Sequence, residues 1–145
     1  MSESFTIVIP ARFGSQRLPG KPLRDIAGRP LIQRTFESAA RSSAANIVVA
    51  TDDEGIAQTV RQFGGESCMT SATHQSGTDR VAEAARILGL APTEIVVNVQ
   101  GDEPDMPGEL IDQVATLLSE DSQAMMATAC TALDQLQQYS DPSVV

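Results

Sequence analysis

The chain alternates short apolar segments with stretches of helical periodicity, and this alternation limits the folds it can adopt. Apolar runs rich in β-branched residues predict strands at 5–9, 46–51 and 94–99, and the segments 66–70 and 125–130 are expected to form further strands. Between them, apolar residues three and four positions apart predict helices that begin near residues 30, 53, 78 and 107. Such alternation is typical of a mostly parallel sheet with helices on both faces. We therefore expect an α/β fold, with 94–99 as its clearest central strand.

The composition agrees with one folded domain. The chain has 145 residues, 41% hydrophobic and 20% charged, which predicts a soluble globular protein with one core. Its first residues lack a basic stretch followed by a long apolar one, and no run approaches membrane-spanning length, so we expect a cytoplasmic protein that does not associate with membranes. Cys68 and Cys130 both fall in predicted strands. We expect both to be reduced thiols in the core.

The charge of the chain is unevenly distributed. The net charge is −9, yet residues 12–29 hold five of the ten basic side chains and only one acidic side chain, Asp25. An acidic protein with one cationic loop is better suited to a small polyanion than to a nucleic acid or an anionic membrane. In parallel sheets, ligands bind beyond the carboxyl ends of the strands, and here the loops that follow predicted strands hold most of the polar residues that need an explanation.

The loop after the first strand, PARFGSQRLPGKPL, suits phosphate binding. Its glycines let the backbone approach a ligand closely, Arg12 and Arg17 can each form paired hydrogen bonds with phosphate, and Lys21 supplies a compact positive charge. It is not a Walker A loop, because five residues rather than four separate Gly14 from Gly20. The alternative is a solvated basic loop whose glycines are structural.

The segment NVQGDEPD places a carboxylate at the end of the strand 94–99. Asp102 directly follows that strand, where a hard cation can bridge it to phosphates. Gln100 can contact a base through its amide or simply end the strand. Glu103 and Asp105 are explained by capping of the next helix.

Two further polar segments precede predicted helices. In HQSGTDR, Ser76 is expected to cap a helix, and the same hydroxyl and backbone N–H groups can hold a nucleotide. His74 has no Cys or His partner at zinc-ligand spacing, so a zinc site is not predicted. No pattern indicates a serine or cysteine nucleophile for it to activate. In TDDEG, Asp52 and Asp53 are both expected to serve the start of a helix as caps.

Taken together, IPARFGSQRLPGKPL, VATDDEG, HQSGTDR and NVQGDEP, in this order and at these separations, resemble the 3-deoxy-manno-octulosonate cytidylyltransferases. The resemblance implies a Rossmann-like nucleotidyltransferase fold. It also implies an enzyme that couples CTP to the sugar acid 3-deoxy-manno-octulosonate (Kdo), releasing pyrophosphate and CMP-Kdo for lipopolysaccharide synthesis in Gram-negative bacteria. The implied reaction is in-line attack by the anomeric hydroxyl of the sugar on the α-phosphorus of CTP.

The resemblance also implies roles for individual residues and partners. Arg12, Ser15, Arg17 and Lys21 would hold the triphosphate, Ser76 and Gln100 would contact cytosine or ribose, and Asp102 would bind Mg²⁺. Asp79 and Arg80 lie in the same motif and are further candidates for nucleotide binding. Arg12, Lys21 and the metal would stabilise charge during the reaction, and the full-length enzyme would be a homodimer.

The family's chains run well beyond 145 residues. The resemblance therefore implies that 1–145 are the nucleotide-binding portion of a single cytidylyltransferase domain whose C-terminal part is absent, and with it most Kdo contacts and a second Mg²⁺-binding aspartate. Two alternatives stay open, another sugar-acid nucleotidyltransferase such as a CMP-sialic acid synthetase and a non-catalytic nucleotide-binding module. A Rossmann dehydrogenase is disfavoured because the first loop lacks the GxGxxG pattern.

Overall fold

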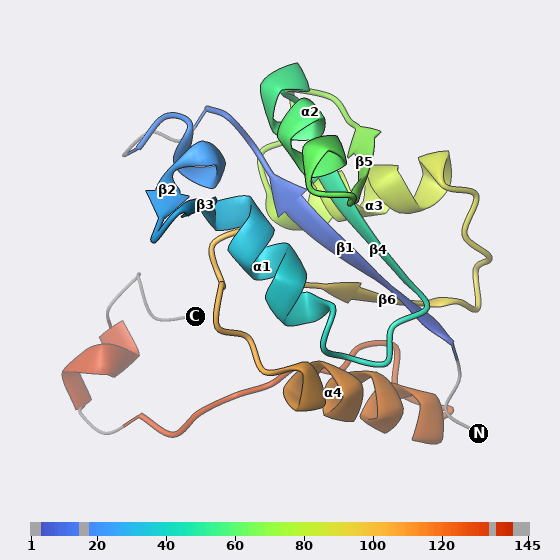
Figure 1. The fold of residues 1–145 in the computed structure, drawn as a ribbon. Coiled ribbons are helices and arrows are strands. Elements are labelled where there is room, and N and C mark those ends of the chain that lie inside the picture. The colour runs from blue at the N-terminus through green and yellow to red at the C-terminus, as the bar shows by residue number, and fades with distance from the viewer. Residues whose placement is uncertain (1–3, 15–17, 134–135, 141–145) are drawn as a thin grey trace.

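The computed structural model describes residues 4–14, 18–133 and 136–140. At its centre is a four-stranded parallel sheet in the order β5-β4-β1-β6 (Figure 1). Its strands are β1 (Phe5–Ala11), β4 (Asn46–Thr51), β5 (Glu66–Met69) and β6 (Ile95–Asn98). A small antiparallel pair, β2 (Asp25–Ile26) and β3 (Arg29–Pro30), stands apart from the sheet. The predicted α/β fold with a parallel sheet is confirmed.

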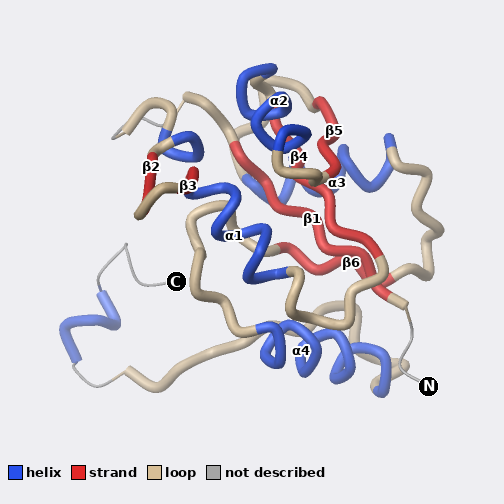
Figure 2. The backbone as a smooth tube through the Cα atoms, in the orientation of Figure 1, coloured by secondary structure: helices blue, strands red, loops and turns tan. Residues whose placement is uncertain are grey.

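Helices follow the strands and cover both faces of the sheet (Figure 2). They are α1 (Leu31–Ala39), α2 (Glu54–Gln62), α3 (Gly77–Ile87) and α4 (Gly108–Glu120), with the short 3₁₀ turns η1 (Lys21–Leu23) and η2 (Leu136–Ser140). All four helices begin within two residues of the positions predicted from the sequence. None of the helices in the described ranges is long and apolar enough to cross a membrane.

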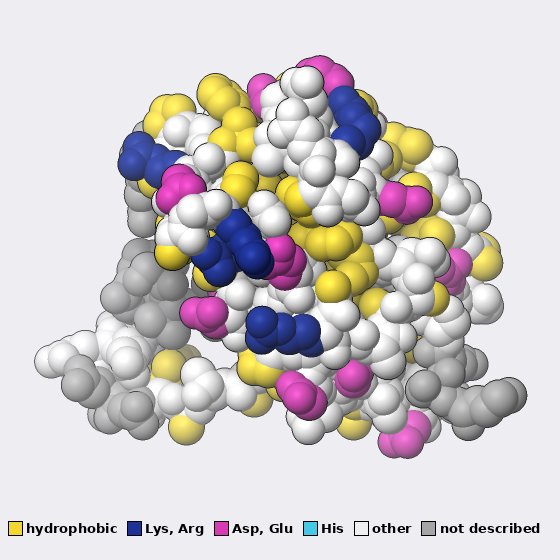
Figure 3. All heavy atoms as spheres, viewed as in Figure 1, with side chains coloured by type: hydrophobic (Ala, Val, Ile, Leu, Met, Phe, Trp, Pro, Cys, Tyr) yellow, Lys and Arg dark blue, Asp and Glu magenta, His cyan; other side chains and the backbone are white. Residues whose placement is uncertain are grey.

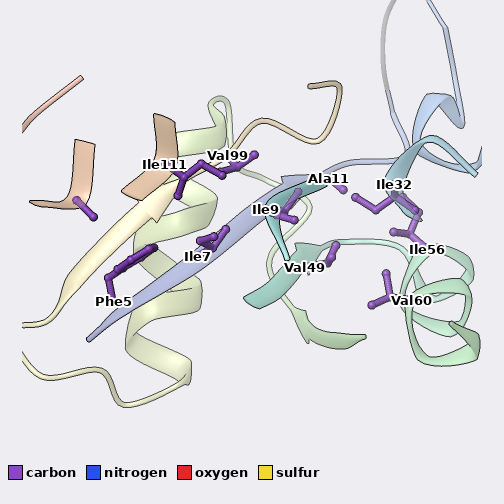
Figure 4. Packing of buried hydrophobic residues seen from close by; sticks show 12 residues of the cluster. Phe5, Ile7, Ile9, Ala11, Ile32, Val49, Ile56, Val60, Val99 and Ile111 are labelled. Atoms are coloured by element: carbon purple, nitrogen blue, oxygen red, sulfur yellow. The ribbon is translucent and has the colours of Figure 1, made fainter. Parts of the chain in front are cut away.

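The core forms two layers because side chains of β1 alternate between the faces of the sheet. Phe5, Ile7 and Ile9 lie on one face with residues of α1, α2 and α4 (Figure 4). Val8 lies on the other face, where it packs with Val81 of α3. The nearly continuous apolar run of β1, in which only Thr6 is polar, therefore reflects burial on both sides, as is usual for parallel sheets.

Close packing fixes the start of α4. A Cβ atom at Gly108 would lie 2.7 Å from the backbone carbon of Arg41, in the turn that follows α1. Ser38 of α1 also donates a hydrogen bond to the carbonyl oxygen of Met106 (2.8 Å). These contacts tie the segment after β6 to α1, so the position of the polar loop 100–105 is set by the helix layer.

Three sequence predictions about the periphery were wrong. β6 is half-buried and lies at the edge of the four-stranded sheet of described residues, not at its centre. Residues 125–130 form no strand, and Met125 is 96% exposed. Cys130 is exposed, whereas Cys68 is buried as predicted. Apolar alternation produces a strand only where a neighbouring strand accepts its hydrogen bonds, and no described strand pairs with 125–130.

An apolar groove runs beside β6. It has a volume of about 850 Å³ and lies between β6 and residues 125–129, with one wall formed by Leu110, Val114 and Leu118 of α4. These three residues are spaced four apart and therefore share one stripe of the helix. The groove thus exposes apolar surface along the edge of the sheet.

Candidate functional site

A cavity of about 270 Å³ lies beyond the carboxyl ends of β1 and β6. Three segments that are far apart in the sequence line most of it, and Leu31 and Arg80 complete the wall. The three segments are residues 10–12 with 21–22, residues 74–77, and residues 100–102. The cavity therefore occupies the position that parallel sheets commonly use for ligands.

Lys21 and Asp102 meet in this cavity. The Nζ atom of Lys21 lies 2.7 Å from Oδ2 of Asp102, although 81 residues separate them. Lys21 begins η1 directly after Gly20, whose φ of 69° is readily adopted by glycine. The backbone N–H of Gly20 donates to the carbonyl oxygen of Phe13 (2.9 Å), which closes the loop and brings Lys21 back toward the sheet.

Asp102 is held in place by the residue before it. A Cβ atom at Gly101 would lie 2.8 Å from the carbonyl oxygen of Pro10, so only glycine lets the loop pass this close to the end of β1. The hydroxyl of Thr35 in α1 donates to the carbonyl oxygen of Gly101 (3.0 Å). A sheet contact and a helix contact therefore fix the backbone beside the carboxylate.

The N-terminus of α3 forms another side of the cavity. Ser76 caps the helix as predicted, because its Oγ accepts a hydrogen bond from the backbone N–H of Asp79 (3.1 Å). The same hydroxyl donates to the Asp79 carboxylate (2.7 Å). Gly77 lies close to Pro10 and Gln100, so the start of this helix packs against the end of β1. Its N-terminus favours anions in the cavity.

Arg80 lines the cavity but is bonded within the protein. Its side chain is 3% exposed. It donates to the hydroxyl of Thr70 (2.5 Å), the carbonyl oxygen of Ser71 (3.2 Å) and the carboxylate of Asp52 (3.2 Å).

The prediction that both aspartates of TDDEG act as caps was wrong for Asp52, while Asp53 caps α2 by accepting from the N–H of Ile56 (2.9 Å).

The comparisons with known proteins agree with this geometry. Residues 6–145 match the family model described as cytidylyltransferase. The chain belongs to the cytidylyltransferase family. It is 53% identical over 145 residues to the 3-deoxy-manno-octulosonate cytidylyltransferase of Pseudomonas fluorescens, and 54% identical over 142 residues to that of Idiomarina loihiensis. The alignments cover 100% and 98% of this chain but 57% and 56% of the relatives, so the chain spans little more than half their length.

Solved structures support the same assignment for this cytidylyltransferase. A CMP:2-keto-3-deoxy-manno-octonic acid synthetase complexed with CTP is 42% identical and superimposes with a TM-score of 0.76, covering 82% of this chain and 48% of that one. A nucleotidyl transferase from Methanothermobacter thermautotroptrophicus is 14% identical with a TM-score of 0.65, over 77% of this chain and 56% of that one. This second likeness shows the shared nucleotidyltransferase fold.

The predicted site residues of the cytidylyltransferase differ in whether they line the cavity. Most of them line the cavity, namely Arg12, Lys21, Ser76, Arg80, Gln100 and Asp102. The Nε2 atom of Gln100 donates to Oδ1 of Asn98 (3.1 Å). The described lining does not include Asp79, whose carboxylate accepts from Ser76. Ser15 and Arg17 lie outside the described residues.

The basic residues of segment 12–29 do not all gather at the site. Arg12 and Lys21 line the cavity, whereas Arg29 forms an ion pair with Glu37 of α1 (2.6 Å). On the face shown in Figure 3, basic side chains lie among acidic ones rather than forming a continuous basic surface. The excess positive charge of this segment is therefore only partly directed at the cavity.

Sequence reasoning missed the role of Glu83 beside the cavity. Its carboxylate accepts a hydrogen bond from the backbone N–H of Ser71 (2.9 Å) and contacts Nε2 of His74, which lines the cavity. These hydrogen bonds, with the one from Ser71 the stronger influence, lower the pKa of Glu83. The available signal was its position on α3, one turn beyond Arg80 on the stretch that follows HQSGTDR.

Proposed function

We propose that this cytidylyltransferase transfers CMP from CTP to Kdo, forming CMP-Kdo and pyrophosphate for lipopolysaccharide synthesis. The observation that carries the proposal is the meeting of Lys21 and Asp102 at 2.7 Å in one cavity, beside the N-terminus of α3. A cation for phosphate, a carboxylate for metal and a helix N-terminus are the groups that a metal-bound nucleoside triphosphate requires. Support for cytosine as the base and for Kdo as the sugar acid comes from the names of the similar proteins.

Six of the site residues have a proposed contact with the phosphates, base or ribose of CTP. Arg12 and Lys21, together with Ser15 and Arg17, hold the phosphates. Ser76 and Gln100 contact cytosine or ribose. Asp79 and Arg80 are bonded to Ser76 and to the neighbouring loops, so in this proposal they support the nucleotide site from behind.

The donor set of the cavity fits Mg²⁺. Asp102 supplies one carboxylate, and the described residues contain no group of three potential metal ligands. Mg²⁺ is commonly bound through one or two carboxylates together with the phosphates of its substrate, so a single carboxylate facing a triphosphate is sufficient from this part of the chain. When bound, the metal would neutralise phosphate charge and make the attacking hydroxyl more acidic.

The chain's own residues supply electrostatic stabilisation. In the reaction, the anomeric hydroxyl of Kdo loses its proton to solvent and its oxygen forms a bond to the α-phosphorus while the bond to pyrophosphate breaks, so negative charge grows on the departing group. Arg12 and Lys21 stabilise that charge. Nε2 of His74 contacts the Glu83 carboxylate, and the proposal assigns His74 no proton transfer.

We further propose that residues 1–145 hold the nucleotide portion of a single domain. Most Kdo contacts, a second Mg²⁺-binding aspartate and a homodimer interface then belong to the part of the relatives' length that this chain does not span. The setting proposed for the reaction is the cytoplasm.

Lys21→Ala and Asp102→Asn test this function. Both side chains are about half exposed, so their ion pair contributes about 0–1 kcal/mol and either variant should remain folded. In a chain of the relatives' full length, we expect each variant to lower pyrophosphate release from CTP, Kdo and Mg²⁺ by roughly 100-fold or more. UTP and sialic acid serve as substrate controls, and circular dichroism reports the fold.

Calorimetry on the 145-residue chain supplies a second measurement. We expect weak binding of CTP in the presence of Mg²⁺ and weaker binding by both variants.

In the pyrophosphate assay, near-normal turnover in either variant would remove that residue from the mechanism. Equal use of UTP, or of sialic acid, would replace the proposed substrates.

A further inference from the structure

We infer that the largely buried Asp52–Arg80 pair positions the backbone beside Arg12, which is proposed to bind phosphate, relative to the N-terminus of α3. The inference rests on the proposed function; it adds Asp52 to the site and specifies how Asp52 and Arg80 act through other residues rather than by touching the nucleotide. Arg80 then has a different role from the direct nucleotide contact predicted from its motif.

Asp52 joins two loops. Its Oδ1 accepts a hydrogen bond from the backbone N–H of Phe13 (3.2 Å), and its Oδ2 accepts from Arg80 (3.2 Å). Phe13 directly follows Arg12, so this bond fixes the backbone from which the Arg12 side chain extends. Asp52 itself comes from the loop after β4 and does not line the cavity.

Arg80 joins α3 to two more positions. One nitrogen of its guanidinium donates to Thr70 and Ser71 in the loop after β5, and another donates to Asp52. Arg80 lies one helical turn after Ser76 on α3. The Arg80 guanidinium therefore ties the loops after β4 and β5 to the helix end that faces the cavity, and the Asp52 carboxylate extends this link to the loop after β1.

Burial makes this arrangement sensitive to substitution. The side chains of Arg80 and Asp52 are 3% and 13% exposed, whereas those of Lys21 and Asp102 are 40% and 51% exposed. A buried charge that loses its partner is strongly destabilising, and a lysine at position 80 cannot reproduce the fork of the guanidinium. Loss of charge at Asp52 should therefore loosen the backbone at Phe13.

The test compares the affinities of the 145-residue chain for CTP and CMP, with Mg²⁺ present. Asp52→Asn keeps the shape of the side chain but removes its charge. We expect it to weaken CTP binding about tenfold or more, as for loss of a charge-assisted hydrogen bond, and CMP binding by less than about threefold. The β- and γ-phosphates need the Arg12 loop, whereas CMP lacks them. Glu54→Gln, which removes a charge from an exposed pair with Arg61, should change neither affinity.

The remaining outcomes separate a structural role from a positioning role. In the double variant Asp52→Asn with Arg80→Gln, we expect the melting temperature to recover relative to either single variant while CTP affinity stays low. Recovery of CTP affinity as well would overturn the inference. An equal loss of CTP and CMP affinity in Arg80→Lys would also overturn it, because it would indicate direct contact with the nucleoside.

Amide hydrogen exchange measured without nucleotide tests the positioning role independently of the proposed function. Asp52→Asn should speed exchange of the Phe13 amide in the empty protein, whereas Glu54→Gln should not. If wild-type chain binds neither nucleotide, the proposed function fails, and unchanged Phe13 exchange in Asp52→Asn would overturn the positioning role separately.

Discussion

Carboxylates in this protein differ in what they do because their surroundings differ. Asp102 is half exposed and paired with Lys21, so it contributes little to stability and is accessible to a ligand. Asp52 is nearly buried and bonded on both oxygens, so its contribution is to geometry. The residue type alone does not distinguish these roles.

Glu83 gives a pH-dependent prediction at the same scale. Its pKa in the folded chain lies below the ordinary value of 4.5, mainly through the hydrogen bond from Ser71 and then that from His74. A depressed pKa contributes stability that is complete above the unfolded-state value and is lost as pH falls through the folded-state value. The wild-type chain should therefore melt higher than Glu83→Gln at pH 6, with the difference shrinking below about pH 4.5. Thermal melts from pH 6 to pH 3 measure this, with Glu120→Gln as control, and a constant difference would contradict it.

At the scale of elements, α2 and α3 both begin with a side-chain cap, but only the cap of α3 lies at the cavity. Asp53 caps α2 and Ser76 caps α3, each through a side-chain oxygen that accepts a backbone N–H. Asp53 does not line the cavity, whereas Ser76 does. The two caps therefore allow stability and ligand binding to be separated.

Asp53→Ala and Ser76→Ala should each lower the free energy of unfolding by about 1 kcal/mol through the lost cap. Only Ser76→Ala should also weaken CTP binding. Urea titrations give the stability, and calorimetry gives the affinity. A matching loss of CTP affinity in Asp53→Ala would show that Ser76 acts on the nucleotide only through general stability.

The helices also set the spacing of the loops. Gly101 and Gly108 permit backbone contacts that a Cβ atom would prevent, the first with Pro10 and the second with Arg41. Together they fix both ends of the segment that carries Asp102. The position of this carboxylate is therefore a property of packed elements rather than of one loop.

At the scale of the whole molecule, the apolar groove lies where the sequence predicted a covered sheet. β6 was expected to be a central strand, yet it borders the groove at the edge of the described sheet. Leu110, Val114 and Leu118 face it from α4, and β6 borders it. Exposed apolar surfaces of this size commonly mark a position where another segment or molecule packs.

The groove should bind the hydrophobic dye anilinonaphthalene sulfonate. We expect dye fluorescence to fall in Val114→Ser, which removes apolar surface from the groove, and to change little in Leu117→Ser. Leu117 is 59% exposed and lies outside the groove lining. Melting curves check that both variants are folded. Equal fluorescence in Val114→Ser and wild type would place the dye elsewhere.

Local sequence patterns were enough to predict the order and type of the four sheet strands and the four helices of the described residues. The apolar run at β1, the 3.6-residue spacing of α1 to α4 and the caps at Asp53 and Ser76 are local signals, and each was confirmed. The parallel sheet followed from the alternation of these elements. The meeting of Lys21 and Asp102 was also foreseeable, because both follow strands whose carboxyl ends share one edge.

The three-dimensional structure was needed to show that Asp52 pairs with Arg80. Asp52 and Asp53 are adjacent and chemically identical, yet one binds Arg80 and the other caps α2. It also decided that 125–130 is not a strand and that Cys130 is exposed. Strand formation and the pairing of charges depend on a partner supplied by a distant part of the chain, whereas helix periodicity and capping depend on residues within one or two turns.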